Sequence, residues 1–445
     1  MISILIPENN IEERTYVVDI MFSEFLGLKY ELETYSGDKY EITLNNNNRI
    51  VIEDHFFIKY PEELSYLHLS NIPKKVNYAK NEFIPENDIP VIYGTNKMEV
   101  GDMSIKCGID IFASSFFMLT RWEEYVDKTR DSHGRFPGKE SFAFKNDILH
   151  RPVVNEYIEM LWNMLVLLDP GLLRKSRTFN LTLTHDVDAP FKYYGFKGGT
   201  KDLLNDILKK KSLKQFYKHI SDKLKTHLKL ADDPYDTFDY FMSLSEELNV
   251  KSYFFFMVHG KSKFDAKYKL NSKRLKRIFE SIKRRGHNTG IHPSYDAFND
   301  KNLFAREKKI LEKHIGKVKC GREHFLRFEM PTTWQIWEDN EMKWDSTLGY
   351  AEKNGFRCGV CNEYSVFNNL TRKKLKLKEK PLIVMDTTYL MYDSYKSEAE
   401  VEQDFRSLTA KVKKYNGELV VLWHNSNVEY PVIWNVFDRV LRDLF

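Results

Sequence analysis

The chain has few of the features that mark a secreted, membrane-spanning or fibrous protein. Only four of its 445 residues are cysteine, too few for a disulfide framework in so long a chain. Its longest apolar runs, such as residues 252–258, fall far short of the roughly 20 residues that a bilayer requires. The N-terminus lacks both the basic start and the apolar core of a signal peptide. These absences predict a folded, cytoplasmic protein.

The chain also has little excess charge. It carries 68 basic and 64 acidic residues, a formal net charge of +4, which does not indicate nucleic-acid binding. One segment departs from this balance, because residues 197–229 hold ten lysines against three aspartates. Leucine and isoleucine recur there at helical intervals, so we interpret it as a basic amphipathic insertion. It is either a solvated helical pair packed on the domain or a peripheral surface for anionic lipid or a polyanionic glycan.

The first part of the chain, residues 1–170, predicts a smaller α+β accessory domain. It combines amphipathic helical patterns with short alternating runs typical of strands. We expect helices over 12–26, 108–125 and 151–168, and strands over 39–44 and 49–52. No group of reactive side chains stands out in this part. A turn-rich basic stretch follows at residues 167–177, where we place the boundary.

The second part, residues 178–445, alternates short β-rich runs with helical stretches, the pattern of repeated β-α units. The expected strands are 179–184, 252–258, 288–294, 324–328, 343–347, 382–388 and 419–424. We therefore predict an α/β fold, an irregular (β/α) barrel with about seven strands. Polar residues gather at the carboxyl ends of these runs, where barrel enzymes place their catalytic groups.

The most informative segment is FNLTLTHDVD, residues 179–188. Strand alternation places Asp186 and Asp188 on one face, where two carboxylates repel each other unless a cation or a shared proton compensates. A divalent metal resolves this if one carboxylate coordinates it and the other acts as a base. The alternative is two exposed loop aspartates, which the preceding β-run disfavours.

Two histidines end later strands. His292 in GIHPS precedes a proline that holds it in an extended conformation, and its imidazole is a candidate zinc ligand. His424 in LWHN follows an apolar run and suits general acid catalysis, because its pKa lies near neutrality. Each could instead be a structural histidine when considered alone.

THDVD, GIHPS, an R-x-x-x-P at Arg327 to Pro331 and LWHN occur in that order. Together they resemble the motifs of the polysaccharide deacetylases, carbohydrate esterase family 4 with the NodB-homology fold. The resemblance covers residues 179–445. It implies that Asp186 is the catalytic base and Asp188 a metal ligand.

The resemblance likewise implies that His292 is a metal ligand, that Arg327 orients the base and that His424 is the general acid. The chain departs from the family at one point, where Asp296 stands in place of a second ligand histidine. The third ligand is then Asp296 or His324, and we expect Asp296 because it occupies the family's ligand position. A nitrogen from His324 would suit zinc better than a second carboxylate.

The resemblance implies a metal-dependent hydrolase, with zinc as cofactor, that removes an N-acyl group, most often N-acetyl, from an amino sugar. The expected substrate is a carbohydrate, nucleotide- or lipid-linked, used in glycan or glycolipid assembly. Two alternatives remain open. The same fold serves hydrolases of small cyclic amides, and a catalytically inactive relative could bind only a glycan or a partner protein.

Overall fold

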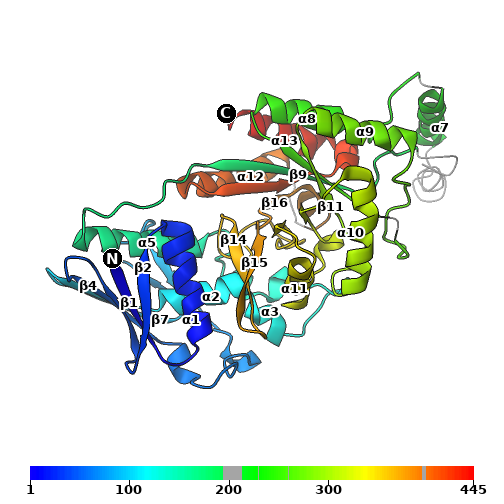
Figure 1. The fold of residues 1–445 in the computed structure, drawn as a ribbon. Helices are drawn as coiled ribbons and strands as arrows, with labels where there is room; N and C mark the ends of the chain where they lie inside the picture. Colours follow the sequence, from blue (N-terminus) through cyan, green and yellow to red (C-terminus); the bar gives the residue numbers. More distant parts are fainter. Residues whose placement is uncertain (194–212, 229, 259, 393–396, 445) are drawn as a thin grey trace. The chain divides into compact units, whose positions relative to one another are not determined.

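The computed structural model describes residues 1–193, 213–228, 230–258, 260–392 and 397–444 (Figure 1). The chain forms two compact units, of which the first comprises 1–180, 325–384 and 407–420 and the second comprises 181–324, 385–406 and 421–445. The first unit thus combines separate stretches of the sequence, whereas the predicted domains, 1–170 and 178–445, are contiguous. Those domain boundaries stay a prediction. Residues 197–212 of the basic insertion lie outside the described residues.

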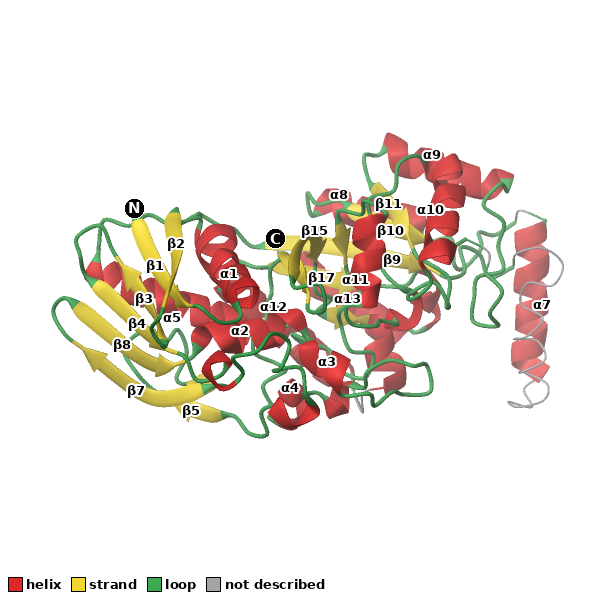
Figure 2. Cartoon of the chain, turned by 60° about the horizontal axis from the view of Figure 1, so that its bottom comes forward, coloured by secondary structure: helices red, strands yellow, loops and turns green. Residues whose placement is uncertain are grey.

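The first unit is built on a six-stranded sheet in the order β2-β1-β3-β4-β8-β7 (Figure 2). The predicted strands at 39–44 and 49–52 are confirmed as an antiparallel pair whose alternate side chains are buried. The strands are β1 (Ile2–Pro7), β2 (Tyr30–Tyr35), β3 (Lys39–Thr43), β4 (Arg49–Glu53), β7 (Gly94–Val100) and β8 (Ser104–Ile109), and a separate pair is formed by β5 (Asn77–Ala79) and β6 (Ile89–Val91).

Helices form in the three stretches of the first unit where apolar periodicity predicts them, although the one expected over 108–125 begins at Ile111 and is interrupted at Arg121, whose φ is 51°. The helix expected over 12–26 forms, but its second half is a π-helix at Ile20–Leu26. The helices are α1 (Ile11–Asp19), α2 (Ile111–Thr120), α3 (Trp122–Val126), α4 (Phe142–Lys145), α5 (Val153–Leu168) and α11 (Thr332–Asp339). Every residue of α2 is buried, so this helix is a core element. The unit also contains β13 (Trp344–Asp345), β14 (Tyr364–Asn368) and β15 (Lys373–Glu379).

The second unit holds a mostly parallel sheet. Its strands are hydrogen-bonded in the order β12-β11-β10-β9-β17-β16. They are β9 (Asn180–Val187), β10 (Ser252–Phe256), β11 (Asn288–Ile291), β12 (Cys320–Gly321), β16 (Val384–Met385) and β17 (Glu418–Leu422). The division between the units falls within β16 and β17 and after the first residue of β9. The pairs β9–β10, β10–β11 and β11–β12 are parallel. A mixed α/β architecture is therefore present, but a closed barrel is not confirmed by the pairings of the described strands.

Amphipathic helices accompany these strands (Figures 1 and 2). They are α7 (Leu213–His227), α8 (Phe238–Glu247), α9 (Lys273–Arg284), α10 (Lys301–Ile315), α12 (Glu398–Lys414) and α13 (Pro431–Arg442). In α9 the apolar side chains at Leu275, Ile278, Phe279 and Ile282 are buried, and the basic ones lie on the other side. Among the described helices, none combines the length and apolarity needed to cross a bilayer.

The strand expected over 324–328 does not form. The strand ends at Gly321, and His324–Leu326 is a turn of 3-10 helix in which Phe325 and Leu326 have φ of 61° and 54°. Two consecutive residues in the left-handed region cannot continue a strand. Arg322 and His324 lie between the end of β12 and the two residues with positive φ.

Candidate metal centre

The polar side chains of the second unit converge where its parallel strands end, because parallel strands present their carboxyl ends at one edge of the sheet. Asp186 lies near the end of β9 and Asp188 directly after it. The other polar side chains at this edge follow the remaining strands. They are Asp265 after β10, His292 after β11, Arg322 and His324 after β12, Asp386 after β16 and His424 after β17.

Asp188, His292 and His324 form a group that can hold a metal ion. One ligand atom from each side chain lies within 4.8 Å of the others. The Nε2 atom of His292 is 3.3 Å from Asp188 Oδ1, and that of His324 is 3.7 Å from the same oxygen. This oxygen is buried and has no hydrogen-bond partner among the described residues. An unpartnered buried carboxylate oxygen facing two imidazoles is a donor set that fits a divalent cation.

The surroundings of His292 determine which ring nitrogen faces the group. Its Nδ1 donates a hydrogen bond to the carbonyl oxygen of Arg322, at 2.7 Å. In the neutral ring the lone pair is then on Nε2, the atom that faces Asp188. A ligand histidine is usually oriented in this way, by a hydrogen bond from the ring nitrogen that does not face the metal.

His324 has a neighbour on its other side. Its Nδ1 lies 3.8 Å from Oδ1 of Asp265, a buried carboxylate in the loop after β10. Asp265 is itself held by the backbone N–H groups of Ser262 and Tyr295, each at 2.7 Å. The carboxylate is thus placed to orient His324, as an outer carboxylate does for a metal-bound imidazole.

The electrostatics of the group keep Asp188 ionised. Burial alone would raise the pKa of this carboxyl, but His324, His292 and His424 together hold it well below its usual range. The same attraction raises the pKa of His292 despite its burial, through Asp186 and Asp188. Asp188 and His292 therefore attract each other, and a metal cation would replace a proton on the His292 imidazole.

Asp186 lies beside this group and is buried. Arg322 holds it through an Nη1–Oδ1 ion pair of 2.9 Å, which leaves Oδ2 near His292, 3.8 Å from Nδ1. The ion pair with a buried guanidinium fixes the orientation of the carboxylate beside the candidate metal group.

A second histidine–carboxylate pair lies across the site. Nδ1 of His424 contacts Asp386 Oδ1 at 2.7 Å, and the backbone N–H of His424 donates to Oδ2 of the same residue, also at 2.7 Å. Asn427 donates to Asp386 as well, at 2.9 Å. Burial would lower the pKa of His424, but Asp386 raises it to about 9. The Nε2 atom of His424 lies 3.9 Å from Asp188 Oδ2, so this ring faces the candidate metal group.

Two expectations for this site need correction. Asp296, expected as the third ligand, is exposed and is not part of the group. The residues after Pro293 form turns rather than a helix, so the spacing of four does not return the carboxylate to His292. The alternative, His324, is the residue that the structure brings to Asp188. Likewise Arg322, not Arg327, pairs with Asp186, and Arg327 belongs to the first unit.

The structure also adds residues that the sequence did not single out as functional. Arg322 directly follows β12. Its position at a strand end could not be predicted from the sequence, because the strand was expected four residues further along the chain. Asp386 lies at the end of an expected strand, which was a usable signal. Asp265 sits in a loop, where no periodicity marks it. The catalytic roles inferred for Asp186 and His424 stay predictions.

Comparisons with known proteins bear on both parts of the chain. The model of a family of unknown function, DUF7033, matches residues 2–170. A solved structure from Mycobacterium smegmatis, described as a "putative polysaccharide deacetylase", is 15% identical, with 60% of this chain and 85% of that chain covered and a TM-score of 0.37. No curated protein matches. The chain thus has a distant structural resemblance to that protein, and its N-terminal part matches a family without a known function.

Proposed function

We propose that the second unit is a metal-dependent hydrolase that removes an N-acyl group, most often N-acetyl, from an amino sugar. The observation that carries this proposal is the group Asp188, His292 and His324, with an ion-paired Asp186 and a carboxylate-bound His424 directed at it. A metal site, a candidate base and a candidate acid at one sheet edge are the parts that metal-assisted amide hydrolysis requires.

Zinc is the cofactor that this donor set suits best. Two imidazoles and one carboxylate are a ligand set found in zinc hydrolases, whereas magnesium and calcium prefer oxygen ligands. When bound, zinc supplies Lewis acidity and lowers the pKa of a coordinated water. His324 in place of Asp296 strengthens the case for zinc, because it adds a nitrogen ligand.

The protein's own residues divide the proton transfers. Asp186, held by Arg322, accepts a proton from the attacking water. His424 donates a proton to the departing amine, and its hydrogen bond to Asp386 favours the protonated ring. Asp386 is fully buried, and its carboxylate positions His424 by contacting both the ring Nδ1 and the backbone N–H of that residue.

The substrate class rests on the motif resemblance alone. We propose a carbohydrate substrate, an N-acylated amino sugar in nucleotide- or lipid-linked form, used in the cytoplasm during glycan or glycolipid assembly. The pairs Asp186–Arg322 and His424–Asp386 are compatible with hydrolysis of other amides too. A panel of N-acetylated sugars and small cyclic amides separates these substrate classes.

Metal analysis tests the proposal. Purified protein loaded with zinc and then desalted should retain about one ion per chain, and Asp188→Ala should abolish this retention. Asp239→Ala, which removes an exposed aspartate of the same unit, is the matched control and should retain the ion. Absence of bound metal in the parent protein would remove the mechanism on which the enzyme proposal depends.

A further inference from the structure

Helix α7 of the second unit exposes an apolar stripe. The side chains of Ile220, Leu224 and Leu228 are 40%, 60% and 61% exposed. They are spaced by four residues, and residues at this spacing lie on one side of a helix. Leu228 directly follows the last helical residue, and its N–H still bonds to the carbonyl oxygen of Leu224 at 2.9 Å. The three side chains therefore form one continuous stripe.

Lysines flank this stripe on both sides. Lys223 and Lys225 are the neighbours of Leu224 in sequence, and one helical residue corresponds to a rotation of about 100°. They therefore lie to either side of the leucine, where their long stems can follow an apolar surface while the ammonium groups stay in a polar layer. The segment 197–229, to which α7 belongs, is strongly basic overall.

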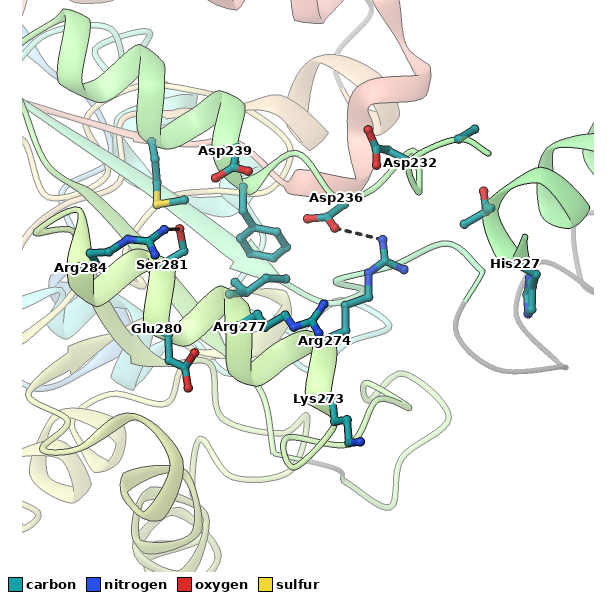
Figure 3. Close-up of a pocket in the computed structure, with 15 residues that line it drawn as sticks. His227, Asp232, Asp236, Asp239, Lys273, Arg274, Arg277, Glu280, Ser281 and Arg284 are labelled. Carbon is teal, nitrogen blue, oxygen red and sulfur yellow. Dashed lines mark hydrogen bonds and ion pairs between the residues drawn. The ribbon is translucent and has the colours of Figure 1, made fainter. Parts of the chain in front are cut away.

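The other side of α7 is polar and faces a cavity. Thr226 is two residues from Leu224, which places it about 160° away around the helix. It lines a cavity of about 830 Å³ together with residues of α8 and α9, among them Asp239, Arg274 and Arg277 (Figure 3). The helix thus presents Thr226 and His227 to the cavity, and the three residues of the apolar stripe are not among those that line it.

We propose that α7 is an interfacial helix that binds the surface of a membrane containing anionic lipid. An apolar stripe bordered by lysines has the composition of helices that lie in the plane of a bilayer, with apolar side chains at the acyl boundary. The lysines are complementary in charge to the headgroups of such lipids. This interaction is separate from the proposed hydrolase activity and requires no metal.

Co-sedimentation of the full-length chain with lipid vesicles tests the proposal. The parent protein should bind vesicles of phosphatidylcholine mixed with phosphatidylserine, bind pure phosphatidylcholine much less, and dissociate as salt is raised. The double variant Leu224→Glu/Leu228→Glu should bind at least roughly tenfold more weakly, because two apolar side chains are lost from the lipid contact. Lys223→Gln/Lys225→Gln, which leaves the stripe intact, should weaken binding and reduce its salt dependence.

Leu173→Glu/Tyr78→Glu is the matched control. It introduces the same charges at two exposed apolar residues outside α7, one of them 87% and the other 46% exposed, and should leave vesicle binding unchanged. Binding that is equal for the parent and both glutamate variants would overturn the proposal.

Three other outcomes would also overturn it. If the parent does not bind anionic vesicles and Leu224→Glu/Leu228→Glu lowers its melting temperature, the stripe is covered within the chain. If the parent forms a dimer that the variant loses, a second copy covers it. Binding to a polyanionic glycan such as heparin without binding to vesicles would assign the lysines to a different ligand.

Discussion

Each unit contains a cluster of buried charged side chains, but only one of the two clusters leaves an atom without a partner. In the first unit, Glu124 accepts from Arg121 at 3.0 Å and from Arg357 at 3.0 and 2.5 Å. Glu123 pairs with the same Arg121 and accepts the N–H of Phe142. Two arginines and two glutamates thus compensate each other. In the second unit, two histidines face one carboxylate whose Oδ1 atom has no hydrogen bond among the described residues.

The difference separates a structural from a functional use of buried charge. A cluster with balanced charge and complete hydrogen bonds restrains its surroundings and offers nothing to a ligand. A cluster whose donors converge on one unpartnered oxygen is completed only by a ligand, here a cation. Burial alone does not distinguish the two clusters, since Glu124 and His292 are both almost fully buried.

The largest effect is expected in the first cluster. Glu124→Ala leaves Arg121 and Arg357 buried with insufficient negative charge, and should lower the free energy of unfolding by about 3–5 kcal/mol. Urea denaturation followed by circular dichroism measures this loss. Glu99→Ala, which removes an exposed ion pair with Lys106, should change it by less than about 1 kcal/mol. Equal effects of the two substitutions would show that the first cluster is not a structural one.

Variants of the proposed acid and base should affect turnover and not stability. Asp186→Asn and His424→Ala should each lower turnover by roughly two orders of magnitude, as expected for groups that transfer protons, while zinc content stays near that of the parent. Single-turnover rates of deacylation on an N-acylated amino sugar, together with metal analysis, give both quantities. Near-parental turnover in either variant would show that the assigned role is wrong.

The choice of third ligand gives a smaller effect. His324→Ala should weaken zinc affinity by roughly tenfold or more, because one of the residues that coordinate the metal directly is lost. Asp296→Ala should leave the affinity unchanged, because that carboxylate is exposed. Competition titration against a zinc chelator compares the two variants. The opposite ranking would restore Asp296 as the ligand.

Acid should distinguish the two units. His185 is buried, with Nδ1 donating to the carbonyl oxygen of Trp423 at 2.8 Å, and burial lowers its pKa to about 3. The unfolded chain, with a histidine pKa near 6.5, then binds a proton that the folded chain does not. The contribution of His185 to stability should fall as the pH drops below about 6.5, by about 1.4 kcal/mol at pH 5.5. His424, whose pKa is raised to about 9, contributes in the opposite direction, because its folded-state proton is held more tightly than in the unfolded chain.

The variant His185→Gln should lose the contribution of His185, so that its stability at pH 5.5 relative to pH 7 is higher than that of the parent, whatever its effect on absolute stability. In the first cluster, the arginines overcome the burial of Glu124 and hold its pKa below its usual range. Its contribution is therefore present at both pH values and is lost only under more acidic conditions. His227→Gln, at an exposed histidine, should retain the parental slope. A slope unchanged in His185→Gln would mean that another group titrates in this window.

Much of the fold follows from local patterns. Alternating apolar residues determine β3 and β4 of the first unit, and the buried run before Asp186 determines β9. Helices such as α9 follow from the period of 3.6 residues, because burying one side of the helix is the dominant local preference. The order of motifs along the chain located Asp186, Asp188, His292 and His424, since each directly follows or ends a strand that periodicity reveals.

The remaining features depend on contacts that are distant in sequence. The sequence by itself determined the α/β pattern, the acidic pair and the two histidines at strand ends. The tertiary structure alone decided that His324 and not Asp296 faces Asp188, and that Arg322 and not Arg327 pairs with Asp186. Two local features give the reason. The residues after Pro293 form turns that leave Asp296 exposed. The strand lies at Cys320–Gly321, so Arg322 and His324 follow it, whereas Arg327 comes after the turn at Phe325 and Leu326, which no apolar periodicity encodes.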